Sequence, residues 1–582
     1  MTSNNRLSRL TSFLLLLALT PAAITFAPAQ QTPKRERRST ATPTASPTPT
    51  PTATPFAKPS SDPTSVKTQI PQAAPSPTAA SGQPKIASPT KTLSELQARI
   101  AAVLRTPELA PATVGIKVAS LDTGRVLFEE NAHKLLRPAS NMKLYTVAAA
   151  LDRLSPDFRF TTSVYAAARP DRAGVVHGDL TIYGRGDPSI AARFNNGDYL
   201  KAIDDLASRV SATGVKRVEG DLIGDETYFT GPQYGSGWEW EDLQWYYGAE
   251  VSALTVNDNA LDLFVKPGLE VGAQVVVTTG PPDPLIKIIN RAITAPKGTK
   301  RDLTVHRGLA ADLVEISGSV PLDDKGYEGG VGISHPALLF VYLLRSSLAR
   351  RGVTITGRSR TVAASAMGGI SVDPVQFYAK LADVKSAPPF EIASMQSPTL
   401  SVVAAQTLKP SQNLYTELIL RTLGKAVPPA STPANAPRTS EDAGLEVVRT
   451  FLKEAGLTPS ALVLSDGSGL SRNDMVTAEA SLQLLTYMSH HRYASVFREA
   501  LPIAGVDGTL RNRLKGTVAE NNVRAKTGSL SSAASLSGYV TSAAGENLVF
   551  SIMVNNFPEE AEPRIVCIDP IVVLLASFAG RS

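Results

Sequence analysis

Apolar and polar residues alternate along the chain from residue 113, and a helical pattern follows. Residues 113–120 are apolar at every second position, which is the period of a half-buried strand. A turn at 122–124 and a second short strand at 125–129 complete a predicted β-hairpin. In 135–151 the apolar residues recur three and four positions apart, so the sequence predicts a helix there.

The C-terminal part of the chain carries a matching set of elements. Strands are predicted at 524–530, 535–541 and 548–555, and an apolar helix follows to about Ala579. We therefore expect the two ends of the folded chain to be halves of one α/β (α+β) unit.

Between about residues 170 and 386 the pattern changes to short β-like runs separated by Gly/Asp turns, as in "VEGDLIGDETYF". One helix, Pro336–Arg350, is predicted within this region. Long β-rich segments between two halves of a unit usually form separate small domains. We expect a first half at 94–169, inserted β-rich domains at 170–386, and a second half at 387–582 that begins with two helices within 397–423.

Residues 1–29 have the charge and hydropathy pattern of a secretory signal peptide. Two arginines precede an apolar run, and the small-residue site Ala27-Pro28-Ala29 ends the segment. We expect cleavage after this site, near Gln30, and export to the periplasm or cell envelope; retention as an uncleaved anchor is the alternative. Residues 30–93 hold 13 of the 43 prolines, among Thr, Ser and Ala, so a disordered linker is expected there.

The basic character of the chain comes from this N-terminal part. The first 93 residues hold ten Lys and Arg against two Asp and Glu, which leaves 48 basic and 50 acidic residues in the remainder. The sequence pI of about 9.1 therefore gives no argument for a nucleic-acid-binding fold, and no nucleic-acid partner is expected.

The histidines and the cysteine do not indicate metal or thiol chemistry. The six His residues show no metal-ligand spacing, and His490-His491 is interpreted as a solvated helix end. The single Cys567 lies in an apolar stretch, where a buried packing role is expected. We expect neither a metal nor an organic cofactor.

All three tryptophans lie in "GSGWEWEDLQWYYGAE", at Trp238, Trp240 and Trp245. Stacking of the rings on sugars and packing in the core of a small domain are both open. We favour core packing, because exposed Trp is unusual outside binding sites.

Ser140 and Lys143 lie three positions apart at the start of the predicted helix 135–151, so they share one helix face. A lysine whose pKa is lowered from about 10.4 can serve as base for a serine nucleophile. The S-x-x-K spacing alone is weak evidence. Ser88 and Lys91 also satisfy it, but they lie in the tract expected to be disordered.

Two further elements supply what such a nucleophile needs. Lys526-Thr527-Gly528 lies on a predicted strand, where Lys526 is a second cation expected to help lower the pKa of Lys143. Gly528 is expected to leave room for a substrate backbone. Ser411-Gln412-Asn413 offers a hydroxyl and an amide at the start of a predicted helix. The same S-x-N spacing recurs at 471–473, which ends a Gly-rich turn and is set aside.

The three elements S-x-x-K, S-x-N and K-T-G together are the signature of active-site serine penicillin-recognising enzymes. From about residue 95 onward the sequence resembles the D-alanyl-D-alanine carboxypeptidase/endopeptidase family, the class C low-molecular-mass penicillin-binding proteins. The segments that carry the resemblance are "RPASNMKLYT", "GDLTIYGRGDPS", "GSGWEWEDLQWYYGAEVSALTVNDN", "KPSQNLYTE", "DGSGLSR", "LPIAGVDGTLRNRL" and "RAKTGSL". The resemblance implies a serine transpeptidase/β-lactamase-like domain interrupted by two smaller β-rich domains.

The resemblance also implies a set of site residues. The implied catalytic residues are Ser140, Lys143, Ser411 and Asn413. The implied substrate-binding residues are Lys526, Thr527, Gly528 and Ser529.

The roles implied for these residues follow the chemistry of an acyl-serine enzyme. Ser140 is the acylated nucleophile and Lys143 its general base, and the S-x-N pair relays the proton to the leaving amine and orients the substrate. Lys526 and Thr527 meet the terminal carboxylate, and the backbone N–H groups of Ser140 and Ser529 form the oxyanion hole. Gln412 stands where many relatives have an acidic residue. "DGSGLSR" is interpreted as a structural turn, because Asp and Ser stabilise such turns locally.

The expected activity is cleavage of the terminal D-Ala-D-Ala bond of peptidoglycan stem peptides, with cleavage of the D,D-crosslink left open. β-Lactams are expected to act as acylating inhibitors. Two rivals remain. One is a β-lactamase or esterase with the same three motifs, which the large insert disfavours. The other is a wall-binding module that keeps the pocket without turnover. The oligomeric state, the preferred third residue of the stem peptide and the function of the inserts stay open.

Export is testable directly. N-terminal sequencing of the mature protein should begin close to Gln30, because the small-residue site before it suits signal peptidase. A cytoplasmic protein with Met1 intact would contradict this expectation.

Overall fold

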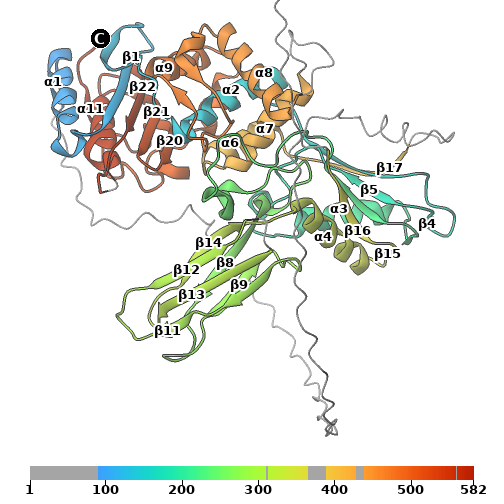
Figure 1. Ribbon diagram of the computed structural model, residues 1–582. Helices are drawn as coiled ribbons and strands as arrows, with labels where there is room; N and C mark the ends of the chain where they lie inside the picture. The colour runs from blue at the N-terminus through green and yellow to red at the C-terminus, as the bar shows by residue number, and fades with distance from the viewer. Residues whose placement is uncertain (1–88, 310–311, 365–388, 428–437, 559) are drawn as a thin grey trace, which may run out of the picture. The chain divides into compact units, whose positions relative to one another are not determined.

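The computed structural model describes residues 89–309, 312–364, 389–427, 438–558 and 560–582 (Figure 1). The predicted signal peptide and nearly all of the predicted linker lie outside the described residues, as does the predicted boundary at 386. Within the described ranges, no helix combines the length and the apolar character needed to cross a membrane.

A five-stranded antiparallel sheet joins the two ends of the folded chain (Figure 1). The two predicted strands at 113–120 and 524–530 are confirmed at those residues. In sheet order the strands are β2 (Val126–Glu130), β1 (Thr113–Ser120), β22 (Asn547–Asn555), β21 (Ala533–Thr541) and β20 (Arg524–Leu530). The strand β20, which carries the K-T-G motif, is therefore an edge strand.

Each face of this sheet packs against helices, because most of its central strand residues are buried on both faces. On one face lie α1 (Leu93–Leu104) and α11 (Asp569–Ser577), the latter preceded by a π-helical turn at Arg564–Ile568. A second hydrophobic core lies between the other face and a group of helices. These are α2 (Met142–Leu154), α6 (Leu400–Leu408), α7 (Asn413–Ala426), α8 (Ser440–Glu454), α9 (Ala478–Ser489) and α10 (Ala494–Ala500).

Helix α2 is the centre of this second core. Ten of its 13 residues, Met142 to Leu151, are buried without interruption. A helix that is buried all round needs apolar or internally hydrogen-bonded residues on every face. This burial explains how Lys143, in the first turn of the helix, is removed from solvent. Two short strands, β18 (Leu462–Val463) and β19 (Met475–Val476), form an antiparallel pair between α8 and α9.

The intervening region forms further sheets that share one hydrophobic core. A five-stranded sheet consists of β16 (Ser359–Val362), β7 (Leu222–Asp225), β5 (Leu180–Tyr183), β3 (Thr161–Ala166) and β17 (Phe390–Gln396). A small parallel sheet consists of β15 (Thr354–Ile355), β6 (Arg217–Val218) and β4 (Val175–Val176).

Two more sheets follow in the same region. One consists of β14 (Tyr327–Gly332), β8 (Ala260–Lys266) and β9 (Val276–Gly280). The other consists of β10 (Lys287–Asn290), β13 (Leu313–Pro321), β11 (Ile293–Ala295) and β12 (Asp302–Arg307). The mixture of helices and several separate sheets confirms the predicted fold class of an α/β (α+β) domain with additional β-rich parts.

The predicted helix Pro336–Arg350 is confirmed as α4, but the expectation of a single helix in the insert was wrong. A second helix, α3, spans Lys201–Ala212. Its apolar residues do follow a helical spacing, and Ile203, Leu206 and Val210 are fully buried. The sequence did not predict this helix, because it lies between Gly/Asp turns of the kind that elsewhere in the insert separate strands.

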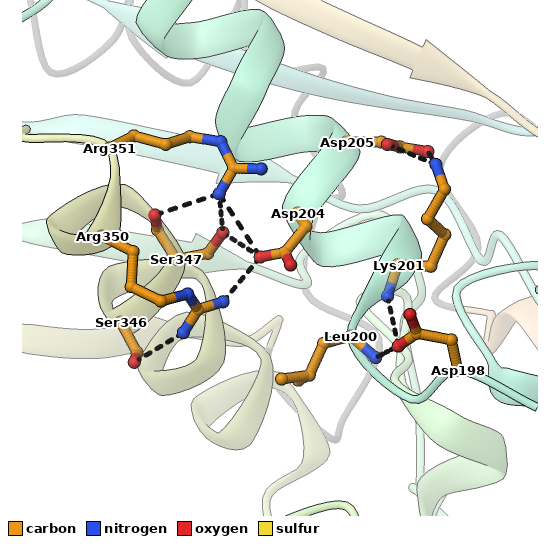
Figure 2. Close-up of polar contacts among 9 residues, drawn as sticks. All are labelled: Asp198, Leu200, Lys201, Asp204, Asp205, Ser346, Ser347, Arg350 and Arg351. Carbon is orange, nitrogen blue, oxygen red and sulfur yellow. Dashed lines mark hydrogen bonds and ion pairs between the residues drawn. The ribbon is translucent and has the colours of Figure 1, made fainter. Parts of the chain in front are cut away.

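Helices α3 and α4 are joined by polar contacts as well as by the shared core (Figure 2). The Asp204 carboxylate accepts hydrogen bonds from the Ser347 hydroxyl and from Arg350, the latter at 2.6 Å, and it lies 3.5 Å from Arg351. Asp204 thus links one face of α3 to the C-terminal turn of α4.

The predicted domain limits at 170 and 386 stay a prediction. Strands β3 and β17 lie just outside those limits, yet both belong to the five-stranded sheet of the intervening region. The two chain segments that connect this region to the helices run side by side. The Ser397 N–H donates to the Phe160 carbonyl, and the Phe160 N–H donates to the Ser397 hydroxyl. This pairing favours limits near Phe160 and Ser397.

Candidate active site

The nucleophile candidate lies on the turn that precedes α2. Ser140 belongs to a 3₁₀ turn at Ala139–Asn141 and is partly exposed, whereas Lys143 is fully buried. The Lys143 Nζ atom lies 2.9 Å from the Ser140 Oγ atom, 2.6 Å from Asn413 Oδ1 and 2.7 Å from the carbonyl oxygen of Ser468. The structure thus brings together the first two motifs. Ser88, the serine of the alternative pattern, lies outside the described residues.

Burial lowers the pKa of Lys143 to about 7. Three buried carboxylates, those of Asp466, Glu417 and Asp474, act in the opposite direction and stabilise the ammonium form. Burial is the largest cause of the lowered pKa at both lysines, and the repulsion between the two ammonium groups lowers the pKa of Lys526 further. Since such a repulsion acts on both groups, the expectation that Lys526 helps to lower the pKa of Lys143 stays a prediction. A lysine with a pKa near 7 can exchange protons at neutral pH.

The third motif meets the second at its serine. The Lys526 Nζ atom donates to the Ser411 hydroxyl at 2.8 Å and to the carbonyl oxygen of Thr527 at 2.8 Å. Lys526 is fully buried, and both of these acceptors are neutral groups, a hydroxyl and a backbone carbonyl. A buried ammonium held by neutral acceptors is suited to an anionic ligand.

Gly528 is required for packing, and its expected role of leaving room for a substrate backbone stays a prediction. A Cβ atom at this position would lie 2.2 Å from the Ser535 hydroxyl and 2.5 Å from the carbonyl oxygen of Pro138. The turn that carries Ser140 therefore lies directly against the edge strand β20. Ser529, the next residue on the strand, is exposed.

The amide of Asn413 is oriented by two partners of opposite character. Its Oδ1 atom accepts from Lys143 Nζ at 2.6 Å, and its Nδ2 atom donates to the carbonyl oxygen of Tyr247 at 2.8 Å. Because an ammonium can only donate and a carbonyl can only accept, this pair of contacts admits one orientation of the amide. Tyr247 belongs to the region between the two halves, which therefore contributes directly to the site.

The loop at 466–471 was interpreted as a structural turn, and the side chain of Asp466 does hold it. Its carboxylate accepts from the backbone N–H groups of Ser468, Gly469, Leu470 and Ser471, at 2.6–3.1 Å. What sequence reasoning missed is the backbone: this turn aims the Ser468 carbonyl oxygen at Lys143. Spacing patterns concern side chains, so a carbonyl acceptor carries no signal of its own.

Thr509 is a second residue that the sequence analysis passed over. The Thr527 hydroxyl donates to the Thr509 hydroxyl at 2.7 Å, and the Thr509 N–H donates to the carbonyl oxygen of Lys409. Thr509 lies within "LPIAGVDGTLRNRL", so the segment that carried the resemblance contained the available signal.

The tryptophans do not share one role. Trp238 is half-buried and donates its Nε1–H to the Asp466 carboxylate at 2.8 Å, and Trp245 packs against the core of the intervening region. Trp240 is 63% exposed, so core packing was wrong for this ring. The prediction for Cys567 is confirmed: the side chain is fully buried, and burial raises the pKa of its thiol to about 12.

Comparisons with known proteins give matches over most of the chain. The profile described as "D-Ala-D-Ala carboxypeptidase 3 (S13) family" matches residues 96–578. A D-alanyl-D-alanine carboxypeptidase from an Actinomadura species is 36% identical over 500 residues, which cover 84% of this chain and 86% of that protein. The D-alanyl-D-alanine carboxypeptidase DacB of Haemophilus influenzae is 24% identical over 454 residues, covering 76% and 85%.

A solved structure shows the same fold. The crystal structure of penicillin binding protein 4 (dacB) from Haemophilus influenzae superposes with a TM-score of 0.65 at 21% identity, over 82% of this chain and 97% of that chain.

Substitution of Gly528 by Ala should disturb the site through packing. We expect the free energy of unfolding in urea to fall by about 1–3 kcal/mol, because the new methyl group overlaps Ser535 and Pro138. The turn that carries Ser140 should shift, so covalent labelling of Ser140 by a penicillin should slow. Gly124→Ala is the matched control: its φ of +74° is strained for Ala, but no atom lies within 4 Å, so labelling should be unchanged. Labelling of Gly528→Ala at the wild-type rate would contradict the packing role.

Proposed function

The chain belongs to the D-Ala-D-Ala carboxypeptidase 3 (S13) family and is a serine-type D-Ala-D-Ala carboxypeptidase, and we propose that it is exported and acts on peptidoglycan stem peptides through an acyl-serine intermediate. The observation that carries the proposal is the buried Lys143, whose Nζ atom lies 2.9 Å from Ser140 Oγ and whose pKa is about 7.

The first chemical step is acyl transfer to Ser140. The Oγ atom attacks the carbonyl carbon of the penultimate D-alanine, and neutral Lys143 accepts the hydroxyl proton. The bond to the terminal D-alanine then breaks, and its nitrogen takes a proton through Ser411, which lies within hydrogen-bond distance of Lys526. The products of this step are free D-alanine and an ester on Ser140. Attack of water on the ester releases the shortened peptide and restores the serine.

Lys526 and Thr527 are proposed to bind the terminal carboxylate of the substrate. Burial and the repulsion from Lys143 lower the pKa of Lys526 well below its usual value. A carboxylate beside it would favour the ammonium form and form charge-assisted hydrogen bonds. The Thr527 hydroxyl, oriented by Thr509, would supply a further hydrogen bond.

The oxyanion that forms in the first step is proposed to bind the backbone N–H groups of Ser140 and Ser529. Ser140 lies in the turn that leads into α2, and Ser529 is an exposed residue of the edge strand β20. Since Gly528 lets this turn and this strand approach each other, the two N–H groups can converge on one oxygen. One such donor is worth about 10²–10³ in rate.

β-Lactams are proposed as acylating inhibitors of the same serine, and the proposal involves no cofactor.

Cleavage of the D,D-crosslink would use the same groups as the carboxypeptidase reaction. Incubation with a crosslinked muropeptide and mass identification of the products therefore separates the two activities. Free D-alanine marks the carboxypeptidase, and uncoupled monomers mark the endopeptidase. Absence of both products would favour a wall-binding module.

The pH dependence of acylation follows from Lys143. The lysine must be neutral to accept a proton, and with a pKa of about 7 it is protonated at lower pH. We expect the acylation rate constant to level off above about pH 8 and to fall about tenfold per pH unit below about pH 6. Stopped-flow measurement with a fluorescent penicillin gives the profile. A rate constant that stays level across this range would remove Lys143 as the base. Lys143→Arg should acylate slowly at every pH in this range, because the guanidinium stays protonated.

Ser140 is the predicted site of covalent labelling. A penicillin should add its whole mass to Ser140, and Ser140→Ala should abolish labelling and lower D-Ala-D-Ala hydrolysis on the order of 10⁶-fold, as for other serine nucleophiles. The fold should survive, because a small hydroxyl at a helix start contributes only about 1 kcal/mol. Ser88→Ala is the control and should change neither property. An adduct mapped to another serine would overturn the assignment.

A further inference from the structure

Three consecutive residues of the intervening region adopt the left-handed backbone conformation. Asn257, Asp258 and Asn259 have φ values of 46°, 59° and 49°. Residues other than Gly seldom adopt this conformation, and a run of three persists only where the surroundings fix it. Here the two asparagines do so. Asn257 accepts from the Ala192 N–H and donates to the Tyr199 carbonyl, and Asn259 accepts from the Val256 N–H and donates to the Glu250 carbonyl.

Asp258, held between these two asparagines, reaches the second motif. Its Oδ2 atom accepts from Gln412 Nε2 at 3.2 Å and from Arg193 at 3.1 Å, and its Oδ1 atom accepts from the Tyr415 hydroxyl. The Asp258 side chain is 19% exposed, whereas Gln412 is 4% exposed and Tyr415 is fully buried. The carboxylate therefore binds one residue within the S-x-N motif and one residue in the first turn of α7.

Gln412 connects Asp258 to the start of α7 and to the two other residues of its motif. Its Oε1 atom accepts from the Leu414 N–H at 3.1 Å and so caps α7, while its Nε2 atom donates to Asp258. Both halves of the amide are thus occupied, which fixes the side chain. Ser411, on one side, has a left-handed φ of 66° and contacts Lys526; Asn413, on the other side, contacts Lys143.

We propose that Asp258 is a positioning residue for the second motif, acting through Gln412 and Tyr415 to hold Ser411 and Asn413 against the two active-site lysines. This inference rests on the proposed function. It makes the region between the two halves a working part of the active site, since Asp258, Arg193 and the Tyr247 carbonyl all come from it.

The charges explain why the middle residue of this S-x-N motif is an amide. A glutamate at position 412 would place a second carboxylate against Asp258, and the repulsion would push the turn away from the lysines. A glutamine donates to Asp258 instead. The other charged and titratable side chains that face Asp258 are Arg193, Tyr199, Tyr246, Asp262 and Tyr415.

The experiment is a charge-reversal cycle on the full chain. Four forms are compared: the wild type, Gln412→Glu, Asp258→Asn and the double variant. For each, a fluorescent penicillin gives the first-order acylation constant at saturation and the concentration that gives half of it. We expect Gln412→Glu to lower the acylation constant about tenfold with little change in that concentration, since the loss is one of positioning. The double variant should recover to within about threefold of the wild type, because the neutral amide that replaces the Asp258 carboxylate no longer repels the glutamate.

The matched control is Asp204→Asn, which likewise removes an arginine-bound carboxylate from the intervening region. Asp204 binds Arg350 and Arg351 and lies between α3 and α4 (Figure 2). Its acylation constant should equal that of the wild type. The inference is overturned if Gln412→Glu acylates as fast as the wild type, if the double variant is no faster than Gln412→Glu, or if Asp204→Asn is equally slow. In each of these cases, wild-type labelling at Ser140 would leave the proposed function standing; a wild type that is not labelled would contradict that function itself.

Discussion

The structure of the site depends on the burial of one amino group. The Nζ atom of Lys143 is removed from water and is held by a serine on its own turn, by an asparagine 270 residues away and by a carbonyl oxygen 325 residues away. An ammonium or amine in such a position is tolerated only if its hydrogen-bonding capacity is used. The three acceptors therefore have to arrive together, and each comes from a differently folded segment.

The surroundings of this lysine balance two opposing effects. Burial favours the neutral amine, whereas the carboxylates of Asp466, Glu417 and Asp474 favour the ammonium. Burial also raises the pKa of Glu417 and Asp474 well above the usual values, so these two acids tend to stay neutral. Within the described part of the chain, each has one side-chain oxygen without a hydrogen-bond partner. A neutral acid requires fewer partners than a carboxylate, and a weakened counter-charge leaves Lys143 near neutrality.

Much of the fold and all three motifs could be predicted from the sequence, because they are local. Strand β1 was predicted at its actual limits from period-two alternation, and the limits of β20 and of the helix Pro336–Arg350 were also predicted. The contacts that orient the motifs could not be predicted, because they join distant segments. The bond from Gln412 to Asp258 spans 154 residues, and the bond from Lys143 to the Ser468 carbonyl oxygen spans 325 residues. The close packing of Gly528 against Ser535 and Pro138 is a contact of the same long-range kind.

The sheet that carries the K-T-G motif pairs the first strand of the folded chain with the last, so that Thr113 lies opposite Asn555. The ribosome synthesises β1 long before β22, because more than 400 residues separate the two strands in the chain. The nucleophile and its lysine emerge early, but the strand that completes their surroundings follows about 400 residues later, at Arg524–Leu530. Long-range pairing of this kind delays assembly of the site until nearly the whole chain has been delivered. The complete site can therefore form only after Arg524–Leu530 has been synthesised.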